Sequence, residues 1–399
     1  MSAAVIHPLE LWLPALGRFD PTHPLHRWLA QSDRLEAGPQ GYLDGLAGYF
    51  DSGAAPMPVA ALTRELLAGD AGEATWLCAD PSWVQPDMTG VRLLACGQMQ
   101  LRMDEAREFA DTLRPVFDEA GVRLEISAAD HWHLRLSPGL ELPDFAAPEQ
   151  ALGEDLYQHL PQGAEGRRWR VLINEVQVLL HQHPRNAARS AAGQPPVNSV
   201  WLWGAGTLPA RVRSRFGGVV GDDVLLTALA ERAKILHQPR TPDSVAAARE
   251  GWLVDLQDLP VADIEHDWWP RLQALAQRQT VRISFASGER WLHLPWHRWR
   301  FWRGSRRKNR VSHKSAFVKC FLHGNVENVS QCWFVVVFKQ KFCGGFVKMI
   351  MSTANLTMGQ VEKWRAKGYI VEVDADNESV NVYKPQQGDP KVNQLPTYS

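Results

Sequence analysis

Apolar and polar residues alternate along this chain with two periods, one typical of helices and one typical of strands. The helical period, with steps of three and four residues, is clearest from 103 to 121 and is carried by Ala106, Phe109, Ala110, Leu113 and Phe117. Two runs that follow, 122–126 and 131–136, alternate apolar and polar residues and predict a pair of strands. The second strand would place His131, His133 and Arg135 on one face. We interpret this as the polar face of a half-covered sheet; the alternative is a face that binds an anion or a metal.

Further periodic runs predict the remaining elements. Apolar helical windows occur at 24–30, 59–67, 225–232 and 269–276. Strands are expected at 74–78, 91–95 and 252–256, with a closing hairpin formed by 281–285 and 291–294. Asp80-Pro81 is expected to end the strand at 74–78. Helices and strands that alternate in this way predict an α/β fold with helices on the faces of a sheet.

The most specific stretch lies between 169 and 209. A helix is predicted to start at Trp169 and end at Pro184, and a buried strand at 200–203 closes on Gly204-Ala205-Gly206. Polar side chains and bare backbone amides thus meet at the two ends of one strand, and strand ends are where α/β sheets bind ligands. An alternative interpretation is that the polar groups fix the proline-rich connection between helix and strand. The candidate anion-binding residues are His183, Asn186, Arg189, Asn198, Gly204 and Gly206.

Several short motifs in this stretch follow one another in a fixed order: His183-Pro184-Arg185-Asn186, Arg189, Gly193, Pro196-Val197-Asn198 and the strand that ends at Gly206. As a run they resemble a signature of the archaeal-type cofactor-independent phosphoglycerate mutases. Residues 1–303 as a whole are similar to bacterial phosphoglycerate-mutase-like proteins described as RpfE-type regulatory proteins. The resemblance implies a partial alkaline-phosphatase-like sheet with helices on its faces.

The resemblance also implies two divalent metals, Mn²⁺ or Mg²⁺, held by an early Asp, a nucleophilic Ser or Thr and a late cluster of Asp and His. Two such metals stabilise the attacking and the leaving oxygen of a phosphoryl group. The late acidic residues of this chain lack a second nearby His: they are Asp255, Asp258, Asp263, His266 and Asp267. We therefore predict no metal and no cofactor, and we assign no catalytic residue.

The function predicted from these residues is that of a binding or regulatory protein, with a small phosphorylated metabolite as the candidate ligand. The first alternative is an active mutase that interconverts 2-phosphoglycerate and 3-phosphoglycerate with Mn²⁺ or Mg²⁺. A second alternative places nucleic-acid or membrane-surface binding in 296–310, where Arg residues alternate with aromatic ones. The structural interpretation of that stretch is an edge strand covered by cation–π pairs.

Composition narrows the class of protein. The 399 residues carry a formal charge of −1 and are 45% hydrophobic, so no overall field selects nucleic acid or membrane as a partner. The first residues lack a basic segment and a long apolar run, and we expect a cytoplasmic protein without a transmembrane segment. The five cysteines form no CxxC pair. The oligomeric state stays open.

Residue usage changes sharply near position 304. Only Lys234 precedes that point, whereas ten lysines lie between Lys308 and Lys391. We therefore expect residues 1–303 to form the phosphoglycerate-mutase-like region, either as one body or as two lobes, 1–165 and 166–303. Residues 304–350 are expected to be a basic and then apolar linker that arose by read-through. Residues 351–399 are expected to form a small α+β appendage, a helix followed by a hairpin.

Overall fold

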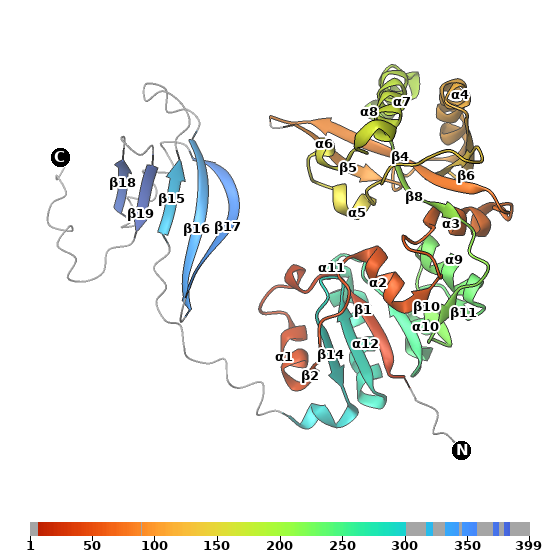
Figure 1. Ribbon diagram of the computed structural model, residues 1–399. Coiled ribbons are helices and arrows are strands. Elements are labelled where there is room, and N and C mark those ends of the chain that lie inside the picture. The colour runs from red at the N-terminus through yellow and green to blue at the C-terminus, as the bar shows by residue number, and fades with distance from the viewer. Residues whose placement is uncertain are drawn as a thin grey trace. The chain divides into compact units, whose positions relative to one another are not determined.

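The structure is a computed structural model that describes residues 7–88 and 90–300 in full. Beyond residue 300 it describes the backbone of five strands, 317–321, 332–342, 345–356, 370–374 and 379–383. The chain forms two units, Met1–Arg306 and Arg307–Ser399 (Figure 1). The first unit contains two lobes, each built on its own sheet.

A seven-stranded sheet forms the first lobe. Its strand order is β11-β10-β12-β1-β13-β14-β2; the strands from β11 to β13 run parallel, and β14 and β2 pair antiparallel. The central strand β1 lies between Pro8 and Pro14, which fall just outside it, so neither proline removes a hydrogen bond from the ladder. The strands span Leu236–Gln238 (β11), Gly218–Val220 (β10), Trp252–Asp255 (β12), Leu9–Leu13 (β1), Val281–Phe285 (β13), Arg290–His293 (β14) and Asp33–Arg34 (β2).

Helices cover both faces of this sheet, and the alternation of β1 shows how. Leu9, Leu11 and Leu13 pack with the helices on one face, whereas Trp12 packs with those on the other. The first face carries α1 (Pro24–Gln31), α10 (Pro242–Ala247) and α12 (Trp269–Arg278), and the second carries α2 (Tyr42–Tyr49) and α9 (Val224–Ala233). The fold is α/β, as the sequence predicts.

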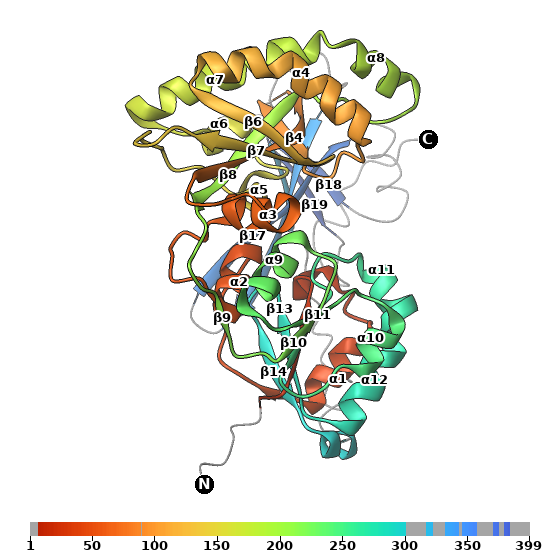
Figure 2. The same ribbon diagram turned by 90° about the vertical axis from the view of Figure 1, so that its right-hand side faces the viewer.

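An antiparallel sheet forms the second lobe. Strand β4 pairs with β8 along one edge and with β7 and β5 along the other, and β6 pairs with β7. Helices α4 and α7 pack on one face, and α3 on the other face shares an apolar core with α9 of the first lobe (Figure 2). The elements are α3 (Val59–Ala68), β4 (Thr75–Pro86), β5 (Val91–Cys96), α4 (Met103–Glu119), β6 (Val122–Ala128), β7 (His131–Leu136), α7 (Gly163–His181) and β8 (Ser199–Thr207).

The strand β4 corrects one prediction. Asp80-Pro81 does not end it; the strand runs through both residues to Pro86. On one edge β7 pairs with 76–78 and β5 pairs with 82–86, so Pro81 sits where neither strand needs its missing N–H. Because the strand continues, Asp80 lies in the middle of the sheet and not in a loop.

A second correction concerns the residues after Pro184. The helix starts at Gly163 and not at Trp169, and it ends at His181, shortly before Pro184, where a new helix, α8 (Pro184–Ala191), begins. His183 is its N-cap, and Pro184 takes the first helical position, where a proline costs no hydrogen bond. The lobes also differ from contiguous ranges 1–165 and 166–303, because each sheet draws strands from both ranges.

The second unit contains a five-stranded antiparallel sheet in the order β17-β16-β15-β19-β18. Strands β18 (Ile370–Asp374) and β19 (Ser379–Tyr383) pair as a hairpin. The other strands are β15 (Phe317–Phe321), β16 (Cys332–Phe342) and β17 (Gly345–Leu356). The helix expected near 357–367 lies outside the described residues, and the read-through origin stays a hypothesis.

Candidate functional site

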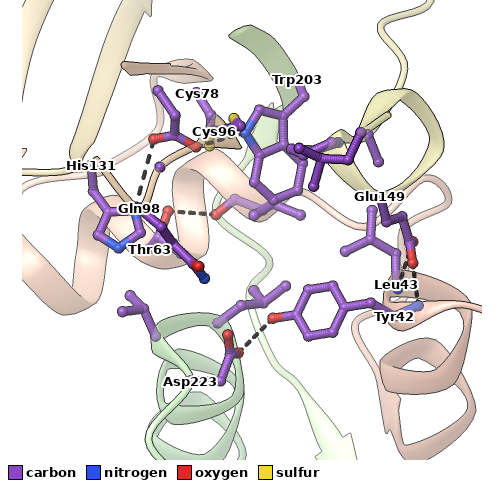
Figure 3. A pocket seen from close by; sticks show the side chains of 18 of the residues that line it. Tyr42, Leu43, Thr63, Cys78, Cys96, Gln98, His131, Glu149, Trp203 and Asp223 are labelled. Carbon is purple, nitrogen blue, oxygen red and sulfur yellow. Dashed lines mark hydrogen bonds and ion pairs between the residues drawn. The ribbon is translucent and has the colours of Figure 1, made fainter. Parts of the chain in front are cut away.

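A pocket of about 360 Å³ lies where the two lobes of the first unit meet (Figure 3). One wall comes from the residues that follow β10, at the carboxyl edge of the parallel sheet, where α/β proteins commonly bind ligands. The other wall comes from the face of the second sheet that α4 and α7 leave uncovered. We call this cavity the interlobe pocket. It is lined by Tyr42, Leu43, Val59, Thr63, Cys78, Asp80, Leu94, Ala95, Cys96, Gly97, Gln98, His131, Ala147, Pro148, Glu149, Leu152, Trp203, Asp223, Val224 and Leu225.

The wall from the second lobe is organised around the buried carboxylate of Asp80. The indole Nε1–H of Trp203 donates to Asp80 Oδ2 at 2.8 Å, and His131 Nδ1 lies 3.7 Å from Asp80 Oδ1. Burial by itself lowers the pKa of His131, but the Asp80 carboxylate acts in the opposite direction and the pKa lies above its usual value. The Asp80 carboxylate therefore favours the protonated form of the His131 imidazole.

The wall from the first lobe holds Asp223 and Tyr42. Asp223 caps α9: its Oδ1 accepts hydrogen bonds from the Leu226 N–H at 2.7 Å and from the Tyr42 hydroxyl at 2.5 Å. Burial raises the pKa of Asp223, and it raises the pKa of the Tyr42 hydroxyl still more. Within the described part of the chain, Asp223 Oδ2 accepts no hydrogen bond.

A carboxylate from the second lobe also caps a helix of the first. Glu149, in the short helix α5 (Pro148–Ala151), accepts the N–H of Leu43 at 3.0 Å and the N–H of Tyr42. These are the first amides of α2, whose partial positive charge favours an anion at that place. The two helix N-termini at the pocket are thus both neutralised by carboxylates of the protein itself (Figure 3).

The remaining titratable groups near the pocket are held neutral. Burial raises the pKa of the Cys78 and Cys96 thiols well above the usual value, so neither is a ready thiolate. His133 is buried between the hydroxyls of Thr63, at 2.9 Å, and Ser127, at 2.7 Å. Burial lowers the pKa of His133 to about 4. The strand thus separates its two histidines: His131 reaches the pocket, and His133 is part of the core.

The acidic residues at the edge of the parallel sheet do not fit a two-metal site. Arg240 binds both oxygens of Asp258, at 2.6 and 2.9 Å, and lies 3.5 Å from Asp222. Asp255 has one buried oxygen, Oδ2, without a hydrogen-bond partner, and burial raises its pKa well above the usual value, which favours the neutral acid. Across 7–88 and 90–300, no three His, Cys, Asp or Glu side chains are grouped so that they could hold an ion.

The other members of the late acidic set lie apart from the strand end. Asp263 ends the short helix α11 (Val261–Asp263), and His266 and Asp267 lie in the π-helical turn that follows. That segment leads directly into α12 and belongs to the helical layer of the sheet. The carboxylates that line the interlobe pocket, those of Asp80, Glu149 and Asp223, come from other parts of the chain.

The predicted anion-binding residues hold the helix–strand connection with their polar atoms. Asn186 donates to the Leu180 and Val197 carbonyls, at 2.7 and 2.8 Å, and accepts the Val197 N–H at 2.8 Å. The buried Arg189 donates to the carbonyls of Pro195, at 2.9 Å, and Met99, at 2.7 Å. These contacts are those of the alternative interpretation, in which polar groups fix the connection.

The other four residues of that set are also accounted for by local structure. His183 Nδ1 accepts the Arg185 N–H at 3.2 Å, and Asn198 exchanges two hydrogen bonds with the backbone of Val84. Gly204 has φ of +66°, and a Cβ there would lie 2.7 Å from Val59 Cβ; at Gly206 it would lie 2.5 Å from Pro58 Cβ. Both glycines allow α3 to approach β8 closely. None of the six lines the interlobe pocket, although their neighbour Trp203 does.

The stretch at 296–310 is described only as far as Arg300. Its first residues form a 3₁₀ turn (Pro295–Trp299) and not an edge strand. The side chains of Trp296 and Trp299 are 54% and 63% exposed, and the guanidinium groups of Arg300 and Arg298 lie 4.3 and 5.2 Å from their ring centroids. Arg300 also binds Asp33 at 2.6 Å. The expected cation–π pairs are therefore present, but in a helical turn.

Comparison with known proteins places part of the chain among relatives. No protein-family model matches it. The 2,3-bisphosphoglycerate-independent phosphoglycerate mutase of Methanosarcina mazei is 28% identical over 167 residues, which cover 41% of this chain and 39% of that protein. A probable enzyme of the same name from Geobacter sulfurreducens is 38% identical over 72 residues, 18% of each chain. Over a segment, this chain is a distant homologue of the cofactor-independent phosphoglycerate mutases.

These matches span less than two fifths of the length of the two mutases. Among solved structures, the cofactor-independent phosphoglycerate mutase from Thermoplasma acidophilum aligns with 72% of this chain and 89% of its own, with 16% identity and a TM-score of 0.34. A Pyrococcus horikoshii protein aligns with 72% of this chain and 87% of its own, with 11% identity and a TM-score of 0.38. Within the described part of this chain, no helix combines the length and apolarity that crossing a bilayer requires.

Proposed function

We propose that this protein binds a small molecule in the interlobe pocket and does not catalyse two-metal phosphoryl transfer. The observation that carries the proposal is that, within the described residues, no three His, Cys, Asp or Glu side chains converge on one point. Arg240 holds Asp258 and lies close to Asp222, while Asp223 caps a helix and binds Tyr42. Metal ligands need free carboxylate oxygens that converge on one point.

The charge of the interlobe pocket supports the same proposal. Its described lining contains Asp80, Glu149 and Asp223 but no Lys or Arg. Phosphoryl groups are bound by Arg, Lys, metal ions or free helix N-termini, and here the two helix N-termini are already capped by carboxylates. A phosphorylated metabolite, the ligand expected from the sequence, is therefore not the ligand that we propose for this pocket.

The regulatory part of the proposal rests on the resemblance of residues 1–303 to RpfE-type proteins. A scaffold that keeps a ligand pocket but lacks a reactive centre suits a protein that senses a metabolite and passes the signal to a partner. We place this activity in the cytosol.

The second candidate function is an active phosphoglycerate mutase, which the segment homology favours. It requires metal ligands that do not converge in the described residues. A third candidate, binding of nucleic acid or a membrane surface through 296–310, draws support from the exposed Trp296 and Trp299 beside Arg298. It predicts association that weakens with salt and is lost when that stretch is deleted.

A turnover assay separates the first two functions. The full chain is incubated with 3-phosphoglycerate and Mn²⁺, and formation of 2-phosphoglycerate is followed by ³¹P NMR. We expect no conversion above that of the protein-free control. Conversion that stops on addition of EDTA and returns with excess Mn²⁺ would establish the mutase and overturn the proposal.

A further inference from the structure

We propose that the interlobe pocket binds a small organic cation, a protonated amine carried on an apolar or aromatic body. The proposal rests on the proposed function, because it assumes that this pocket is the ligand site. It adds the chemical class of the ligand, which neither the fold nor the relatives supply. Three features carry it: the balance of charge, one free carboxylate oxygen and two aromatic walls.

The described lining of the pocket carries three carboxylates, those of Asp80, Glu149 and Asp223, against one imidazole, that of His131, so acidic groups are in excess. Asp80 lies beside the imidazole of His131 and accepts the Trp203 N–H, and Glu149 is matched by the two amides of α2. Asp223 caps α9, whose N-terminus supplies about half a positive charge against a full negative one. With no Lys or Arg in the described lining, a cationic ligand completes the balance.

The free oxygen of Asp223 provides a direct contact. Its Oδ1 is already engaged by the Tyr42 hydroxyl and the Leu226 amide, whereas Oδ2 has no hydrogen-bond partner in the described residues. Burial is the largest cause of the raised pKa of this carboxyl. A bound ammonium group would favour the ionised form and form a charge-assisted hydrogen bond.

The aromatic walls suit the body of such a ligand. Trp203 lies on one side of the pocket and Tyr42 on the other (Figure 3). The aliphatic side chains of Leu43, Leu94 and Leu152 also line it. Indole and phenol faces attract cations and cover apolar surface. A pocket of about 360 Å³ is large enough for a compact amine of this kind.

The opposite charge is disfavoured by the same groups. A phosphate or carboxylate ligand would face the Asp223 carboxylate, and it could reach the amides of α2 only by displacing Glu149. Leaving a charged group unmatched in a partly buried site is costly. The geometry therefore distinguishes ligands by the sign of their charge.

Calorimetric titration of the full chain tests the inference with three probes and MnCl₂. The probes are 2-phenylethylamine, 3-phenylpropionate, which carries the same ring with the opposite charge, and 3-phosphoglycerate. We expect the amine to bind, and the two anions to bind at least about tenfold more weakly. Tighter binding of either anion, or binding of Mn²⁺ that excludes the amine, would overturn the inference.

Two variants, Asp223→Asn and Leu94→Trp, test whether the amine binds in the pocket, and Asp222→Asn is the control. Asp223→Asn removes the charge but keeps the helix cap and the acceptor for Tyr42, and we expect about tenfold weaker amine binding. Asp222→Asn removes a charge one residue away, outside the lining, and should leave binding unchanged. Leu94→Trp fills part of the pocket and should weaken binding of every probe.

The outcomes separate this inference from the proposed function. Probes that bind irrespective of charge, but are blocked by Leu94→Trp, would leave the pocket as the ligand site and refute the cation. Amine binding that neither Leu94→Trp nor Asp223→Asn weakens would place the ligand elsewhere and refute both. Absence of binding by all three probes also counts against both. Matching thermal unfolding curves of the variants would exclude misfolding as the cause.

Discussion

Replacement of Asn186 by alanine tests whether the strongest sequence motif serves the fold. The side chain is buried and forms three hydrogen bonds, to Leu180 O, Val197 O and Val197 N, at 2.7 to 2.8 Å. Asn186→Ala leaves the N–H and the carbonyl of Val197 without this partner, whereas the Leu180 carbonyl keeps the His183 N–H at 3.1 Å. Each buried polar group left unsatisfied costs about 1–3 kcal/mol, and water that enters the space recovers part of this. For two such groups we expect a loss of about 2–4 kcal/mol in the free energy of unfolding.

Urea denaturation followed by tryptophan fluorescence measures this loss. The matched control is Asn174→Ala, which removes an exposed asparagine from α7 and should change stability by less than about 0.5 kcal/mol. A loss of less than about 1 kcal/mol for Asn186→Ala would refute the structural role. A ligand-binding role would instead predict a stable variant with altered binding of phosphate.

Three further predictions concern stability. The pKa of His133 is about 4 against a usual 6.5, so the unfolded chain takes up the proton first as the pH falls. The native state should therefore lose about 3 kcal/mol of stability between pH 6.5 and pH 4. His133→Gln should flatten the pH dependence of the urea midpoint. Gly204→Ala should lower the melting temperature, because the residue has φ of +66° and the new Cβ would lie 2.7 Å from Val59 Cβ. The control Gly217→Ala, whose Cβ would meet no atom within 4 Å, should leave the melting temperature unchanged. Equal melting temperatures for the two variants would count against this packing. Because the pKa of Asp255 is raised in the folded state, the parent protein should lose stability as the pH rises. The stability of Asp255→Asn relative to the parent should therefore increase from pH 5 to pH 8. A difference between their thermal unfolding curves that stays constant over this range would contradict the prediction.

Much of the fold follows from local pattern in the sequence. The stripe of α4 and the alternation of β6 and β7 predict elements that the structure contains, because each buries one continuous apolar face. The strand β1 was not predicted: its five residues lie between prolines, and only the pairing with β12 and β13 marks them as central. The continuation of β4 through Pro81 also depends on strand pairing. A proline is tolerated there because β7 pairs with the residues before it and β5 with those after it, and the sequence alone does not show this.

The candidate site was harder to predict than the fold. Asp80, His131 and Asp223 are far apart in sequence and meet only because the second lobe is inserted between strands of the first sheet. His131 stood out only as one polar residue in an alternating strand. The run from His183 to Gly206 stood out most, yet its polar groups bind backbone that the proline-rich connection leaves without partners. A specific motif can therefore mark a scaffold rather than a site.

The central proposal is that the described residues of this phosphoglycerate-mutase-like scaffold form no two-metal centre. Equilibrium dialysis of the full chain against Mn²⁺, with the bound metal counted by mass spectrometry, tests it most directly. We predict no stoichiometric binding, because no three His, Cys, Asp or Glu side chains of the described residues are grouped so that they could hold an ion. Saturable binding of about two Mn²⁺ per chain, lost in Asp255→Asn or Asp223→Asn, would contradict the account.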